Sequence, residues 1–111
     1  MALEEIIANH ASIDVDLGAG KQVFPAKSVA EKWSAYDWIY WRLRAMSEER
    51  QRAVVRELCK RYGFDLKSHC RSTIMNWKDI RNLARDPLVT IGAHTAGHFA
   101  LAKLSMARAR N

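Results

Sequence analysis

The chain has 111 residues, of which 49% are hydrophobic and 27% are charged, so it can bury a modest core but excludes a large barrel within its own length. No apolar run is long enough to cross a bilayer as a helix, so a membrane is not an expected partner. Lys and Arg exceed Asp and Glu by six, but the basic residues are spread among apolar positions without a nucleic-acid signature, so nucleic acid is not an expected partner.

The cysteines and the N-terminal residues give evidence on the cellular compartment of the protein. Cys59 and Cys70 have neither CxxC spacing nor further partners, which indicates reduced thiols. The sequence shows no basic and then apolar leader, although one could lie upstream. We therefore expect a cytoplasmic protein with no structural disulfide.

The first 27 residues predict a helical end followed by a hairpin. Apolar residues at helical spacing favour a helix over residues 2–9, which begins abruptly, without a preceding cap. Ile13, Val15 and Leu17 then alternate with aspartates, and two glycines precede a second apolar pair. This pattern is typical of a β-hairpin, and Pro25 ends it. A two-stranded unit of this size needs another element to pack on.

Ser28 is suited to cap a long helix that reaches about Ala45. Five residues of this helix repeat at three- and four-residue steps and predict its core face. They are Val29, Trp33, Tyr36, Tyr40 and Leu43. Trp38 and Trp41 lie off that face, so the helix is sandwiched between layers or one flank binds a ligand. A carbohydrate-stacking platform at Trp38 and Trp41 is the alternative to a purely structural role.

Two further helices are expected before residue 87. Ser47 begins one that Gly63 ends, and its predicted apolar stripe comprises Val54, Val55, Leu58 and Cys59. A loop through His69 and Cys70 follows. Asn76 then caps a second helix, with Asp79 at its third position. Its predicted buried side comprises Trp77, Ile80 and Leu83. Pro87 stops this helix because proline lacks an amide hydrogen.

A short apolar strand is expected at residues 88–91, bounded by proline and glycine, as in a buried parallel sheet. A lone buried strand is not stable and needs neighbours that the chain, apart from its hairpin, does not offer. A further helix is expected to begin near Phe99. We find no internal repeat.

His94 and His98 follow the predicted strand and are four residues apart. Residues at this spacing share one face of a helical turn, and imidazole is a common ligand for zinc. The alternative is a pair of capping or core histidines. The motif lacks the glutamate of a metalloprotease helix. His10 and His69 have no useful spacing to the pair, and the nearby aspartates occupy predicted caps, so no third ligand is identified.

The wider run from Trp77 to Ser105, which includes DPLVTIGAHTAGH, resembles the polysaccharide deacetylase family (NodB homology, carbohydrate esterase family four). In that family H-T-x-x-H is the second motif, and its histidines hold a divalent metal, usually zinc. The resemblance assigns these roles to His94 and His98, with Thr95 as the neighbouring motif residue. Residues 1–75 look, more loosely, like an insertion between the first and second motifs, and residues 76–111 like the helix, strand and metal region.

The resemblance implies an α/β fold, a distorted (β/α) barrel, of which this chain would be a mainly helical middle slice with a hairpin and one buried strand. It implies hydrolysis of an N-acetyl group from an N-acetylhexosamine poly- or oligosaccharide, in which the metal polarises the amide carbonyl and an aspartate activates water.

The family's T-F-D-D-G motif, which supplies the base and an aspartate ligand, is absent from this sequence, as are the later motifs that supply the acid. We therefore expect weak zinc binding, no catalytic residue and no activity from the isolated chain. The alternative is a non-catalytic interaction module that associates with itself or with a companion chain, because of its unpaired strand and surplus tryptophans.

Overall fold

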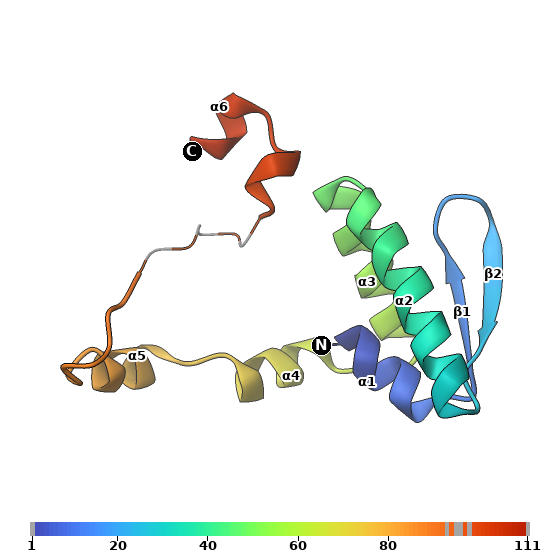
Figure 1. Cartoon of the computed structure of the whole chain (residues 1–111), viewed down its shortest axis with the longest axis horizontal. Helices are drawn as coiled ribbons and strands as arrows, with labels where there is room; N and C mark the ends of the chain where they lie inside the picture. Colours follow the sequence, from blue (N-terminus) through green and yellow to red (C-terminus); the bar gives the residue numbers. More distant parts are fainter. Residues whose placement is uncertain (1, 93, 95–96, 98, 111) are drawn as a thin grey trace. The chain divides into compact units, whose positions relative to one another are not determined.

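The computed structural model describes residues 2–92, 94, 97 and 99–110 (Figure 1). The chain is mainly helical and forms two compact units, Met1–Leu66 and Lys67–Asn111. Its elements in order are α1 (Ala2–Asn9), β1 (Ser12–Asp16), β2 (Lys21–Pro25), α2 (Val29–Ala45), α3 (Glu48–Arg61), α4 (Leu66–Thr73), α5 (Trp77–Leu83), the 3₁₀ turn η1 (Leu101–Lys103) and α6 (Met106–Ala109). None of the helices in the described residues is long and apolar enough to cross a membrane.

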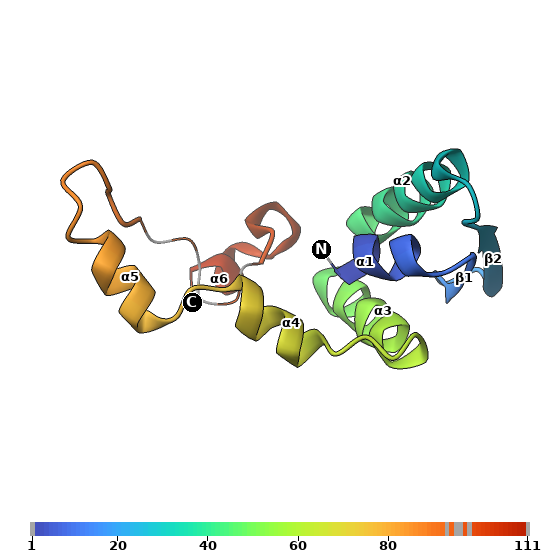
Figure 2. The ribbon, with the colours of Figure 1, turned by 90° about the horizontal axis from the view of Figure 1, so that it is seen from below.

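The first unit packs three helices and the hairpin around one core. Helix α1 contacts both α2 and α3, while β2 lies on α2 and β1 lies on α3 (Figure 2). Ile6, Ile13 and Ile39 are the largest side chains that are fully buried there. They come from α1, β1 and α2, so each element contributes its apolar side to the same interior. The hairpin therefore has the packing partner that its small size requires.

The register of the hairpin explains why a strand can end in proline. β1 and β2 are antiparallel, with Ser12 opposite Pro25. The next residue, Ala26, donates its amide to the carbonyl of Ala11 at 2.8 Å. Hydrogen-bonded pairs alternate along an antiparallel ladder, so Pro25 occupies a position that needs no amide donor. In the turn, Gly18 and Gly20 both have positive φ, as the sequence pattern suggests.

Side chains at the end of α3 form hydrogen bonds with the main chain of β1. The Asp14 amide donates to the Tyr62 hydroxyl at 2.6 Å, and the Arg61 guanidinium donates to the Asp14 carbonyl at 3.0 Å. Arg61 also pairs with the carboxylates of Asp14 and Glu57, at 2.9 and 2.8 Å. The contacts to Asp14 join residues that are 47 and 48 positions apart in sequence.

The predicted helix ends are confirmed where local chemistry determines them. Ser28 and Glu31 form a reciprocal capping box at the start of α2, and Asn76 and Asp79 form another at the start of α5. Gly63, at φ +63°, follows α3. There the Phe64 amide donates to the Cys59 carbonyl at 2.8 Å, as in a Schellman motif.

The predicted core face of α2 is confirmed at Leu43, with Tyr36 and Tyr40 half-buried against the core, and it is wrong at Val29 and Trp33. Its buried residues are Ala35, Ile39 and Leu43, which are spaced four apart. Val29 and Trp33 are 73% and 67% exposed. Because these three residues lie along one line of the helix, the side chains of Val29 and Trp33 fall beside that line. On α3 the predicted stripe is confirmed for Val54, Leu58 and Cys59, and Val55 is half-buried.

The second unit departs further from the sequence expectations. Residues 66–73, expected as a loop, form α4, in which Ser72 and Thr73 donate their hydroxyls to the His69 carbonyl. On α5, Trp77 is 75% exposed and Ile80 is only half-buried, so this helix does not bury the predicted side. After Phe99, where one helix was expected, the structure has the short 3₁₀ turn η1 and the short helix α6 instead.

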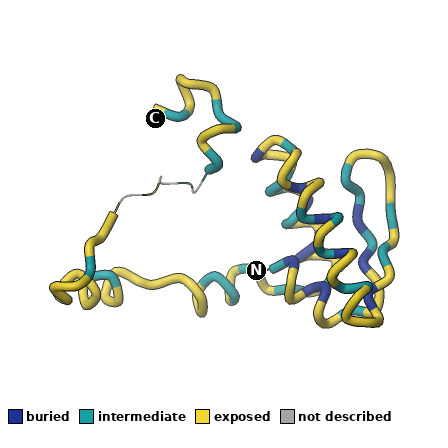
Figure 3. The backbone as a smooth tube through the Cα atoms, viewed as in Figure 1, coloured by how far each residue is buried: buried dark blue, intermediate teal, exposed yellow. Residues whose placement is uncertain are grey.

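The predicted buried strand at residues 88–91 is not formed, and Leu88 is 93% exposed. No described residue between 67 and 110 is buried, as the colours of Figure 3 show. Because the described residues of this unit form no neighbouring strand, the apolar run has no described strand to pair with.

Candidate functional site

Only one of the two predicted metal ligands can be placed. His94 lies in an irregular segment, and its side chain is exposed. Thr95 and His98 lie outside the described residues. Among the residues that are described, no three His, Cys, Asp or Glu side chains gather closely enough to hold a metal ion. No metal centre is therefore built from the described geometry.

The other candidate ligands have structural partners of their own. His10 Nδ1 lies 2.8 Å from the carbonyl oxygen of Ile6, and its ring packs edge-on against Tyr62 with centroids 4.6 Å apart. Asp79 closes the capping box of α5, while Asp86 accepts a hydrogen bond from the Leu88 amide at 2.9 Å. These contacts agree with the capping roles that the sequence predicts for the aspartates.

The two tryptophans that the sequence paired as a platform have different contacts in the structure. Trp38 packs on Phe24, with ring centroids 4.7 Å apart, and the Arg42 guanidinium lies 4.6 Å from its ring centroid. Because Arg42 and Phe24 both contact its ring, Trp38 has a packing role in the structure. Trp41 is 62% exposed and donates its indole N–H to Asp37 at 3.0 Å.

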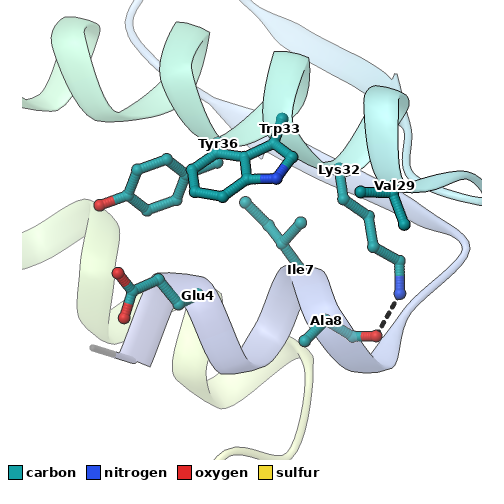
Figure 4. Close-up of a pocket in the computed structure, with 7 residues that line it drawn as sticks. All are labelled: Glu4, Ile7, Ala8, Val29, Lys32, Trp33 and Tyr36. Atoms are coloured by element: carbon teal, nitrogen blue, oxygen red, sulfur yellow. Dashed lines mark hydrogen bonds between the residues drawn. The ribbon is translucent and has the colours of Figure 1, made fainter.

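A pocket of about 230 Å³ lies between α1 and α2 (Figure 4). Its lining is mainly apolar and includes Ile7, Ala8 and Val29, with the exposed Trp33 over Ile7. Glu4 lies on the side of the Tyr36 hydroxyl, and Lys32 lies at the other end of the pocket. An apolar hollow with a few polar groups is the usual form of a small-ligand site.

The charged groups at the pocket are tied to the fold. Lys32 donates to the carbonyl oxygen of Ala8, in the last turn of α1, where a helix leaves carbonyls without intrahelical partners. Burial and then the negative charge of Glu4 raise the pKa of Tyr36, so its hydroxyl stays neutral over the physiological range. The pocket therefore presents a neutral phenol, a carboxylate and an indole.

Sequence reasoning missed this pocket because it assigned Trp33 to the core. The spacing of Trp33 and Tyr36 fits a buried stripe, and only the packing of Ala35 shows that the buried line runs beside them. A signal was present in the small residue at position 35, since helices approach most closely at small side chains.

Comparison with models of known protein families, with curated proteins and with solved structures finds no match to this chain.

Proposed function

We propose that this chain carries the metal-holding segment of a polysaccharide deacetylase, an enzyme that hydrolyses N-acetyl groups of an N-acetylhexosamine poly- or oligosaccharide. The support is the run from Trp77 to Ser105, in which a capped helix, an Asp-Pro stop and an apolar run precede H-T-x-x-H. The exposure of His94 is compatible with the role, because an exposed imidazole can meet a metal from solvent.

In this proposal His94 and His98 are the metal ligands and Thr95 is their motif neighbour. A bound zinc ion would supply Lewis-acid chemistry at the amide carbonyl. The 111 residues contain neither T-F-D-D-G nor the later motifs, so they supply no candidate base, acid or oxyanion donor. The chain alone is expected to release no acetate.

Zinc calorimetry on the whole chain tests the metal role. We expect weak binding of one zinc ion, lost in both His94→Ala and His98→Ala and retained in the matched control His69→Ala. Two nitrogen ligands without a third hold zinc less tightly than the three of a catalytic site. Equal binding in all four proteins, or binding in none, would refute the role of the pair.

An acetate assay with a chito-oligosaccharide tests the expected inactivity. Purified wild-type chain should release no acetate above the buffer, with or without zinc. Release that disappears in His94→Ala would overturn this expectation and would show that the chain is catalytic by itself.

A second candidate function, a non-catalytic interaction module, is favoured by a specific observation. Residues 67–110 bury no described side chain but expose many large apolar ones. These are Ile74, Met75, Trp77, Leu83, Leu88, Ile91, Leu101 and Met106. Exposed apolar side chains in such number are typical of association surfaces. The same residues carry eight Lys and Arg against two Asp and Glu, so two copies repel until salt screens them.

Light scattering after size exclusion, at low and high salt, tests the interaction module. Self-association should increase with salt, and Trp77→Ala should reduce it while Trp33→Ala, in the other unit, should not. A companion chain in place of a second copy would be acidic, because the unit is basic. A monomer at every salt concentration would exclude self-association.

A further inference from the structure

Four aromatic rings form an unbroken row along α2. Trp33 contacts Tyr36 at a centroid distance of 6.1 Å with rings nearly perpendicular, at 86°. Tyr36 stacks on Tyr40 at 5.5 Å and 17°, and Tyr40 meets Trp41 at 5.3 Å and 78°. We call Trp33, Tyr36, Tyr40 and Trp41 the aromatic row. Its members hold one another in fixed orientations, because each ring packs on the next.

The two ends of the aromatic row are open to solvent. Trp33 and Trp41 are 67% and 62% exposed, whereas Tyr36 and Tyr40 are half-buried. Packing alone explains the inner tyrosines, but it does not explain two indoles that leave most of their apolar surface in water. A rise of 1.5 Å per residue places the two tryptophans about 12 Å apart along the helix axis. The row therefore suits an extended ligand.

Carboxylates accompany both exposed indoles. Asp37 lies one helical turn from each tryptophan and accepts the Trp41 indole N–H at 3.0 Å. A carboxylate has about four acceptor sites. Asp37 can therefore accept the hydrogen bond from the indole and still accept hydrogen bonds from sugar hydroxyls. Glu4 lines the same pocket as Trp33, on the side of the Tyr36 hydroxyl. The row thus has one carboxylate at Asp37, between the two indoles, and a second carboxylate in the adjoining pocket.

We propose that the aromatic row and the adjoining pocket bind a neutral oligosaccharide. The apolar C–H face of a sugar ring packs on an indole, while its hydroxyls donate to carboxylates. Single-stranded nucleic acid also stacks on aromatic rows, but it needs a basic groove. Here Asp37 and Glu4 would repel phosphates, and residues 1–66 hold ten basic and ten acidic residues.

The pocket favours an acetylated sugar. Its walls at Ile7, Ala8 and Val29 are apolar, and they suit the methyl of an acetamido group better than a hydroxyl. The choice of N-acetylhexosamine rests on the proposed function, whereas the sugar-binding row rests on α2 alone. The proposed site would bind the polymer and would take no part in the chemistry at His94.

Titration of the whole chain with chitotetraose, followed by calorimetry in the presence of EDTA, tests the proposal. Trp33→Ala and Trp41→Ala should each weaken binding roughly two- to ten-fold, the loss expected for one aromatic contact. Trp77→Ala is the matched control, because Trp77 is also mostly exposed but belongs to the other unit, and this variant should bind the sugar like wild type. Circular dichroism checks that the exposed-site variants remain folded.

Three results would overturn the proposal: no binding to wild type, unchanged binding in both row variants, or tighter binding of a single-stranded oligonucleotide than of the sugar. Cellotetraose, which lacks the acetamido group, should bind more weakly than chitotetraose if the pocket takes that group. The His94→Ala variant should bind the sugar normally. If the wild-type chain binds the sugar but no zinc, only the metal role is refuted. If it binds zinc but no sugar, only the aromatic row is refuted.

Discussion

Ile39 shows how much of the fold depends on a few side chains of the first unit. It is fully buried at the centre of α2, between Ala35 and Leu43. Ile39→Ala should lower the free energy of unfolding by about 2–5 kcal/mol, because it removes buried methyl groups and leaves a cavity. Urea denaturation measures this change. Ile74→Ala is the control. Because the Ile74 side chain is 67% exposed, this change should alter the free energy of unfolding by less than about 0.5 kcal/mol. Comparable losses of unfolding free energy in the two variants would contradict the assigned core.

Glu31 makes the first unit sensitive to acid. The backbone amides of Ser28 and then Lys27 donate to its carboxylate, which lowers its pKa below the ordinary value for glutamate. The carboxylate therefore stabilises the fold fully above the ordinary pKa, and this stabilisation is lost as pH falls through the lowered value. Glu31→Gln should reduce the melting temperature near about pH 7, and its difference from wild type should shrink near about pH 3. A difference independent of pH would contradict the ionic role.

At the scale of the element, the end of α3 depends on one backbone conformation. Gly63 has φ +63°, and the amide that follows it completes the Schellman motif. Gly63→Ala should destabilise the protein by roughly 1 kcal/mol, since a Cβ disfavours this conformation. Gly92→Ala is the control, because Gly92 has no positive φ and open space around its Cα. Equal effects at both glycines, measured by urea denaturation, would show that the end of α3 does not depend on the conformation of Gly63.

The elements predicted correctly are those whose signals are local. Ser28, Asn76 and Gly63 mark helix ends by hydrogen bonds within five residues, so the sequence around them contains the whole cause. The exposure of Trp33 was not predictable in this way, because it depends on which neighbours pack against Ala35. Similarly, five of the eight residues 66–73 are weak helix formers, and Leu66 and Cys70 are the only apolar residues among them, too few to predict a helix. For the candidate metal site, spacing alone places His94 and His98 together, and no contact of the described residues adds to it.

For the whole molecule, stability is divided unequally between the two units. All the buried residues that the structure describes lie between residues 3 and 59, and the second unit has none. Hydrogen exchange on the full chain should therefore protect amides of α2 and α3 for much longer than those of α5, because local opening costs little where little surface is buried. Protection of α5 equal to that of α2 would indicate that the second unit is covered in solution.

The contacts at Asp14 have a consequence for solubility. The outer edge of a two-stranded sheet exposes amides and carbonyls to which a strand of another molecule can add, and this addition starts aggregation. Asp14 lies at a position whose main-chain groups face away from β2, and both are already engaged, the amide by Tyr62 and the carbonyl by Arg61. A strand that approached β1 would first have to displace these side chains. Side chains at the end of α3 thus occupy the hydrogen-bonding groups of Asp14, the middle residue of β1, and hinder the addition of another strand there.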